Sequence, residues 1–69
     1  MSFTKRYARE IVAENMSLER GIPIDAVYDI LDRIQDLIYD YRSGIGEYES
    51  EDDILTDFGI PVEFSFIFD

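Results

Sequence analysis

Five aspartates recur through the middle of the chain at spacings of four, three, four and four residues, with no glutamate or lysine among them. At about 100° of rotation per residue, these spacings place all five carboxylates on one narrow face of a helix. Aspartate holds its carboxylate close to the backbone, so the row forms a fixed line of negative charge about 22 Å long at a 1.5 Å rise per residue. Such a line could imitate a phosphate backbone. We call these residues the aspartate stripe: Asp25, Asp29, Asp32, Asp36 and Asp40.

The ordinary explanation of this stripe, a solvated helix face, stays open. Solvent faces usually mix glutamate with lysine or arginine, however, and aspartate is a poorer helix former whose like charges repel at i,i+4 spacing. The five charges are also sparser than a DNA strand, which carries about one per 3.4 Å. We therefore expect a partner-binding surface that extends into a second set of acids: Glu47, Glu49, Glu51, Asp52 and Asp53.

Part of this second set has another explanation. Acids in the first turn of a helix complement its dipole, which accounts for residues 51–53 and leaves Glu47 and Glu49 unexplained. A calcium loop is not indicated, because the D-x-[DN]-x-[DN]-G spacing that ends in glutamate is absent. The chain also has neither histidine nor cysteine to bind zinc. We expect no bound metal and no cofactor.

The residue types also argue against catalysis. The chain has no histidine to act as a general base, no cysteine nucleophile, no glycine-rich phosphate loop and a single lysine. The carboxylates that remain would need a cleft, which a helical domain of 69 residues can hardly enclose. We expect a protein that is not an enzyme, and we assign no catalytic residue.

Two long helices must position the stripe. Residues 3–20 carry apolar side chains at helical spacing, and Gly21 suits the left-handed position just past a helix end, with Ile22 folding back on the last turn. Pro23 then suits the first turn of a second helix. Residues 23–42 show the strongest 3.6-residue period in the chain, with the stripe directly opposite the apolar face.

A shorter helix follows a glycine-containing loop. Ser50 with Asp53 three residues later resembles a capping box, which predicts a helix over residues 51–58. The tripeptide Gly-Ile-Pro at residues 59–61 ends that pattern, and the same tripeptide at residues 21–23 ends the first helix.

The C-terminal segment has a different period. Val62, Phe64, Phe66 and Phe68 alternate with other residues, which is typical of a strand with one apolar face. The only other segment that could pair with it as a strand is residues 45–49, whose strand pattern is weak. In the simplest interpretation this strand covers the helices; its unpaired edge could also recruit a second strand, in a twofold dimer or from a partner. The oligomer-forming residues are then Phe64, Phe66 and Phe68.

We therefore predict a mainly α fold in one domain spanning residues 1–69. The two long helices form an antiparallel pair. A short third helix lies across one end of this pair, and a C-terminal β-strand or extended segment packs on the remaining apolar surface. The connection between the first two helices resembles a helix-turn-helix in outline, but the second helix lacks the basic residues that read DNA. With no disulfide and no zinc, packing or self-association must hold so small a domain together.

The charge distribution narrows the class of partner. The net charge is −10: the first twenty residues hold four basic and three acidic side chains, and no basic residue follows Arg42. Such a field repels nucleic acid and anionic membranes and attracts basic surfaces. No apolar run is long enough to span a membrane, and we expect a cytoplasmic protein.

Our leading hypothesis is an inhibitor or decoy that occupies the basic, nucleic-acid-binding surface of another protein. In size and charge the chain resembles the small acidic anti-defence proteins of bacteriophages, such as antirestriction and anti-CRISPR DNA mimics. The alternative is an assembly or regulatory module that binds through the phenylalanine-rich strand. A further option is an antitoxin-like partner of a basic toxin, which the sequence does not separate from the first.

Overall fold

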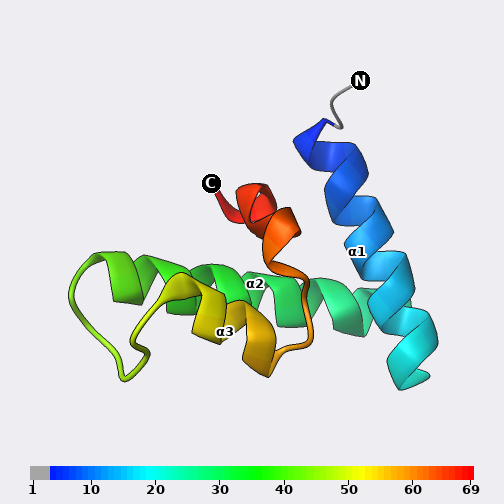
Figure 1. The fold of residues 1–69 in the computed structure, drawn as a ribbon. Coiled ribbons are helices and arrows are strands. Elements are labelled where there is room, and N and C mark those ends of the chain that lie inside the picture. Colours follow the sequence, from blue (N-terminus) through cyan, green and yellow to red (C-terminus); the bar gives the residue numbers. More distant parts are fainter. Residues whose placement is uncertain (1–3) are drawn as a thin grey trace.

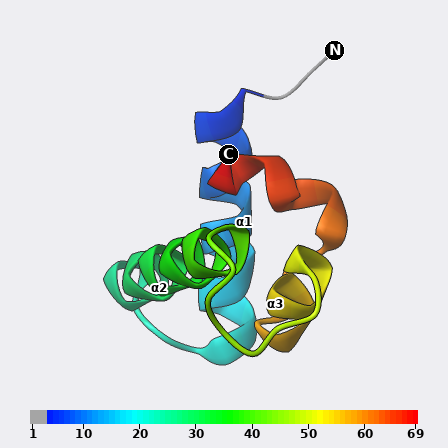
Figure 2. The same cartoon turned by 90° about the vertical axis from the view of Figure 1, so that its left-hand side faces the viewer.

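The computed structural model describes residues 4–69, and these residues form helices without any β-strand. The mainly α class is confirmed. In chain order the elements are α1 (Lys5–Arg20), α2 (Ile24–Arg42), α3 (Glu51–Asp57) and the 3-10 helix η1 (Val62–Phe68). Figure 1 shows α1 crossing α2 steeply near the start of α2, while α3 runs back alongside α2. Figure 2, which looks along α2, shows α3 beside it and η1 above both, against α1.

The ends of α1 follow from local chemistry. Thr4 caps the helix, because its Oγ1 accepts a hydrogen bond of 3.2 Å from the Tyr7 backbone N–H. At the other end Gly21 is left-handed with φ 64°, and its N–H donates to the Ser17 carbonyl at 2.9 Å. The predicted left-handed cap is confirmed. Residue 3, the predicted start, lies outside the described residues; Thr4, which the prediction placed inside the helix, is its N-cap and has an extended backbone.

The other two α-helices match their predicted ranges closely. Pro23 is the residue before α2 and has an extended backbone, so α2 begins one residue later than predicted and ends at Arg42. Ser50 caps α3, since its hydroxyl oxygen accepts from the Asp53 N–H at 3.2 Å. The helix ends at Asp57, one residue before the predicted end.

One apolar core lies where the elements meet. Each helix contributes side chains that are at most 5% exposed, and α2 contributes the central ones. The largest fully buried side chains are Val27, Leu31, Ile34, Ile38, Ile54 and Leu55. Because α2 presents apolar residues along its whole length, several elements share its inner face.

The predicted antiparallel pairing of the first two helices is wrong. α1 covers the beginning of α2, and α3 is the element that runs antiparallel beside the remainder (Figure 1). The physical reason is that all the apolar surface of α2 must be covered. A crossing α1 covers part of it and leaves the rest to α3, so α3 lies along α2 and not across one end.

The predicted C-terminal strand is also wrong, because residues 62–68 form η1. Ile67, placed by the alternation on the polar side, is only 3% exposed, whereas Val62, placed on the apolar side, is 49% exposed. With three residues per turn, positions i and i+3 share a face, so Phe64 and Ile67 point the same way. A lone strand would leave backbone groups unpaired, whereas the Phe64 N–H donates locally to the Pro61 carbonyl at 3.0 Å.

This correction removes the edge on which strand pairing depended. Phe68 is buried, and Phe64 and Phe66 are half-buried against the core. The proposed mate at residues 45–49 is a loop. The three phenylalanines therefore belong to the interior of this fold and form no strand edge among residues 4–69.

Polar contacts hold η1 in place. The Lys5 ammonium donates to the backbone oxygen of Asp69, and Gln35 Nε2 on α2 donates to the Phe68 carbonyl at 2.8 Å. Arg20, at the end of α1, donates to the Phe58 carbonyl at 2.8 Å. Side chains from α1 and α2 thus bind backbone oxygens that the short helices α3 and η1 leave open.

Candidate acidic binding surface

The aspartate stripe lies on the outer side of α2, as its spacing predicts. Asp25, Asp29, Asp32 and Asp36 are exposed, and Asp40 is half-buried near the end of the helix. The opposite side of α2 carries its buried residues. Asp25 also lies in the first turn, where a negative charge complements the helix dipole.

One member of the stripe has an intramolecular partner. Asp32 accepts a hydrogen bond from Arg9 of α1 at 3.3 Å, and the same guanidinium lies 5.4 Å from the ring centre of Tyr28. Asp32 therefore helps to hold the crossing of α1 and α2. Among residues 4–69 the other four stripe carboxylates form no ion pair, and we call them the open stripe: Asp25, Asp29, Asp36 and Asp40.

Glu51, predicted to extend the stripe, has a structural role instead. Its Oε1 lies 2.7 Å from Nη2 of Arg42, and the same nitrogen lies 2.7 Å from Oδ1 of Asp69. These hydrogen bonds, that of Asp69 foremost, raise the pKa of Arg42. Glu51 thus joins the start of α3 to the end of α2.

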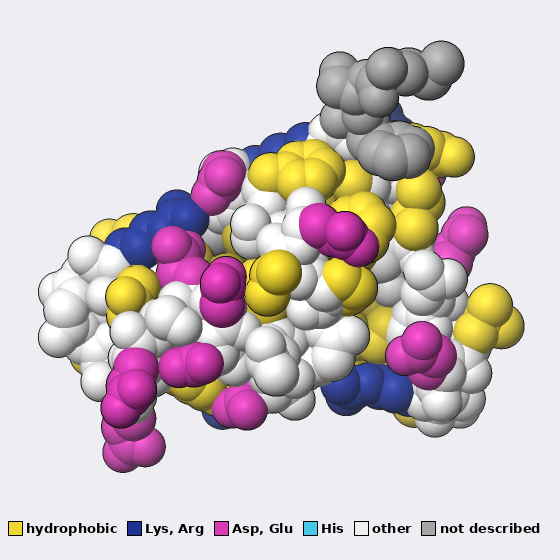
Figure 3. All heavy atoms as spheres, viewed as in Figure 1, with side chains coloured by type: hydrophobic (Ala, Val, Ile, Leu, Met, Phe, Trp, Pro, Cys, Tyr) yellow, Lys and Arg dark blue, Asp and Glu magenta, His cyan; other side chains and the backbone are white. Residues whose placement is uncertain are grey.

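The remaining predicted acids are exposed, and all of them except Glu47 lie apart from the stripe. Asp52 and Asp53 occupy the first turn of α3, and Glu47 and Glu49 lie in the preceding loop. Because α3 packs on the apolar side of α2, its acids lie across that helix from the stripe. Figure 3 shows the α3 side of the molecule, where neutral and apolar surface separates the acidic side chains. The structure does not bring the ten predicted acids onto one surface.

A groove joins the stripe to the loop at the end of α2. It has a volume of about 220 Å³, and Asp40 and Glu47 both line it. The other lining residues are mainly apolar or aromatic: Leu37, Tyr41, Ile45, Gly46 and Tyr48. We call it the loop groove. The groove is not predicted by the sequence alone; its one sequence signal is Ile45, which stands between two glycines in a polar loop.

The tyrosine hydroxyls of this groove have internal partners. Tyr41 donates to the Glu49 carbonyl at 3.2 Å. Tyr48 hydrogen-bonds to the Asp57 carboxylate of α3, and this bond, together with burial, raises the pKa of the Tyr48 phenol. The two rings are therefore held in position from both sides of the loop.

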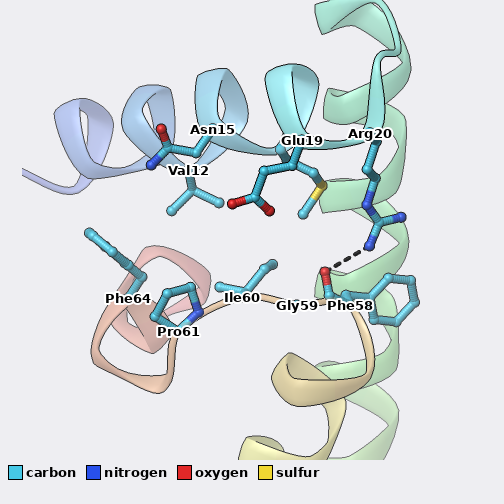
Figure 4. Close-up of a pocket in the computed structure, with 10 residues that line it drawn as sticks. Val12, Asn15, Glu19, Arg20, Phe58, Gly59, Ile60, Pro61 and Phe64 are labelled. Atoms are coloured by element: carbon cyan, nitrogen blue, oxygen red, sulfur yellow. Dashed lines mark hydrogen bonds between the residues drawn. The ribbon is translucent and has the colours of Figure 1, made fainter.

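A second hollow of about 150 Å³ lies between α1 and the segment that links α3 to η1. Figure 4 shows Val12 and Glu19 of α1 facing Ile60 and Phe64, with the Arg20 hydrogen bond to the Phe58 carbonyl at one end. No stripe residue lines this hollow.

Within residues 4–69, no group of three or more carboxylates is placed to hold a metal ion. No helix in the same region is long and apolar enough to cross a membrane. No protein-family model matches the chain, and no curated protein or solved structure matches it either.

Proposed function

We propose that this chain is a non-enzymatic acidic protein whose open stripe binds a basic surface of another protein. That surface is of the kind that otherwise holds a nucleic-acid backbone, so the chain acts as an inhibitor or decoy. The observation that carries this proposal is the open stripe itself. Like charges at i,i+4 spacing weaken a helix, yet α2 keeps three exposed aspartates and one half-buried aspartate with no ion pair among residues 4–69.

The use of the basic side chains supports the proposal. Lys5, Arg9, Arg20 and Arg42 all make contacts within the fold, either to carboxylates or to backbone oxygens. Few cations are thus left to balance the surface, and the net charge of −10 acts on a partner from a distance.

The geometry also sharpens the choice of contact residues. Asp32 and Glu51 are engaged internally, so the open stripe makes the primary contacts. Asp40 and Glu47 continue them around the end of α2, because both line the loop groove. The acids of α3 face another direction and contribute to the long-range field only.

The first test is affinity capture from host lysate at low and at high salt. A triple variant Asp25→Asn, Asp29→Asn and Asp36→Asn removes three charges from the stripe. The matched control removes three exposed charges from α1, through Glu10→Gln, Glu14→Gln and Glu19→Gln. We expect the stripe variant to lose the captured protein and the control to keep it, because contact pairs matter more than net charge.

The second test is competition. Labelled duplex DNA is bound to the captured protein, and the acidic chain is then added. We expect release of the DNA, and an affinity that falls steeply with salt. Simultaneous binding of both ligands, or an affinity that salt leaves unchanged, would overturn the proposal. The identity of the partner then separates an anti-defence inhibitor, which binds a restriction or CRISPR component, from an antitoxin, which binds a basic toxin.

A further inference from the structure

The loop groove exposes apolar surface that the fold does not use. Ile45 is 63% exposed at its edge, although it lies in a well-formed turn where its N–H donates to the Asp40 carbonyl at 2.8 Å. Leu37 lies along the same groove and is only half-buried. Exposed aliphatic side chains beside a groove are typical of a place where a partner side chain is buried.

The walls of the groove are held in a defined shape. The Tyr41 and Tyr48 hydroxyls bond to Glu49 and Asp57, as described above. A groove with fixed walls costs less conformational entropy when a ligand enters it.

The negative charge of the groove favours a positively charged ligand. Asp40 and Glu47 both line it, and among residues 4–69 neither carboxylate forms an ion pair. A basic side chain, Arg33, lies one turn before Leu37; it acts electrostatically on Tyr48 and forms no ion pair with a carboxylate among residues 4–69. The groove therefore combines apolar surface, tyrosine rings and uncompensated negative charge.

We propose that the loop groove binds the side chain of an arginine of the partner. The aliphatic stem of that arginine packs on Leu37 and Ile45, and its guanidinium lies between Asp40 and Glu47. An arginine is favoured over a lysine because its planar guanidinium also stacks on tyrosine rings. This inference rests on the proposed function, and it adds a specific anchor to the nonspecific attraction of the stripe.

The test uses a capped arginine, N-acetyl-arginine-methylamide, as the probe. The full chain is labelled with ¹⁵N and titrated with this compound, with capped citrulline as the neutral isostere. We expect amide shifts confined to residues 37–48 for arginine and none for citrulline. Ile45→Ser should weaken arginine binding by about tenfold, since it removes apolar surface from the site. Leu18→Ser is the matched control, because Leu18 is 82% exposed and lies outside the groove.

Two further variants test the charges in opposite directions. Glu47→Gln should weaken arginine binding, and Arg33→Gln should strengthen it, because the change removes a nearby repelling cation. All of these positions are exposed, so folding is retained and can be checked by circular dichroism. The proposal would be overturned by two results together. Arg33→Gln would leave the affinity for arginine unchanged, and Ile45→Ser would change that affinity no more than Leu18→Ser does.

The titration also separates this inference from the proposed function. Shifts spread evenly along α2, equal shifts with citrulline, or no shifts at all overturn the arginine site. The proposed function survives those outcomes if DNA competition and the stripe variants behave as expected. Conversely, localised arginine shifts support the site even if the captured partner proves not to compete with DNA.

Discussion

Arg42 and Asp69 form an ion pair of 2.7 Å that joins the last turn of α2 to the residue after η1, 27 positions further along the chain. The same guanidinium also binds Glu51 at the start of α3. Three elements thus meet at one cation in a protein with few basic side chains. The carboxylates engaged there stabilise the fold, and they are distinct from the open stripe that we assign to binding.

Arg42→Gln should therefore lower the stability of the fold. The side chain is about half exposed, so we expect a modest loss that shrinks as salt screens the two ion pairs. Urea unfolding at low and high salt measures it. Arg6→Gln is the control, because Arg6 is 92% exposed on its side chain and lies 3.9 Å from Glu10. Equal losses for the two variants would contradict the bridging role of Arg42.

Gly21→Ala should destabilise the chain by about 1 kcal/mol. Gly21 has φ 64°, and a Cβ there meets no atom within 4 Å, so backbone strain is the only cost. Gly21→Asn should lose less, since asparagine tolerates the left-handed region better. Chemical denaturation gives both values. If the two variants are equally unstable, the strain is not the cause.

The Tyr48 phenol should titrate above its ordinary value of about 10, because the Asp57 carboxylate accepts its hydrogen bond and repels its ionised form. Because folding raises the pKa of Tyr48, this contact stabilises the fold at pH values below the ordinary pKa of the phenol. That stabilisation is lost as the pH rises through the pKa of the folded state. Tyrosine-resolved NMR titration measures the shift. Asp57→Asn should lower the pKa of Tyr48; an unchanged pKa would show that the charge of Asp57 has no influence.

Asp36→Asn should stabilise the fold while weakening partner binding. Asp36 has like charges four residues away on both sides, at Asp32 and Asp40, and relieving each pair is worth about 0.2–0.5 kcal/mol at low salt. Asp52→Asn is the control of opposite sign, because Asp52 complements the dipole in the first turn of α3. Thermal unfolding compares the two variants. A destabilised Asp36→Asn protein would mean that the stripe serves the fold and not a partner.

Local chemistry made much of the fold predictable. Helical periods, the Ser50 cap and the left-handed glycine at position 21 each depend on a few neighbouring residues, and all three appear in the structure. The exposed stripe on α2 was predictable for the same reason, because the spacing alone places its members on one side of a helix.

The other features depend on contacts between residues far apart in the sequence. The alternation in residues 62–68 is typical of a strand, but a strand needs a mate, and in its absence among residues 4–69 the segment forms η1. The steep crossing of α1 arises from the need to cover α2 jointly with α3, while η1 packs against α1 and α3.

By itself, then, the sequence determined three α-helices, their ends, the acidic character of the chain and the outward row of aspartates on α2. The tertiary structure alone decided which acids stay open. It paired Asp32 with Arg9 and Glu51 with Arg42, and it brought Asp40 and Glu47 to one groove beside the exposed Ile45. The physical reason is that periods and caps act within a turn or two of chain, whereas ion pairs and grooves depend on how separate elements pack.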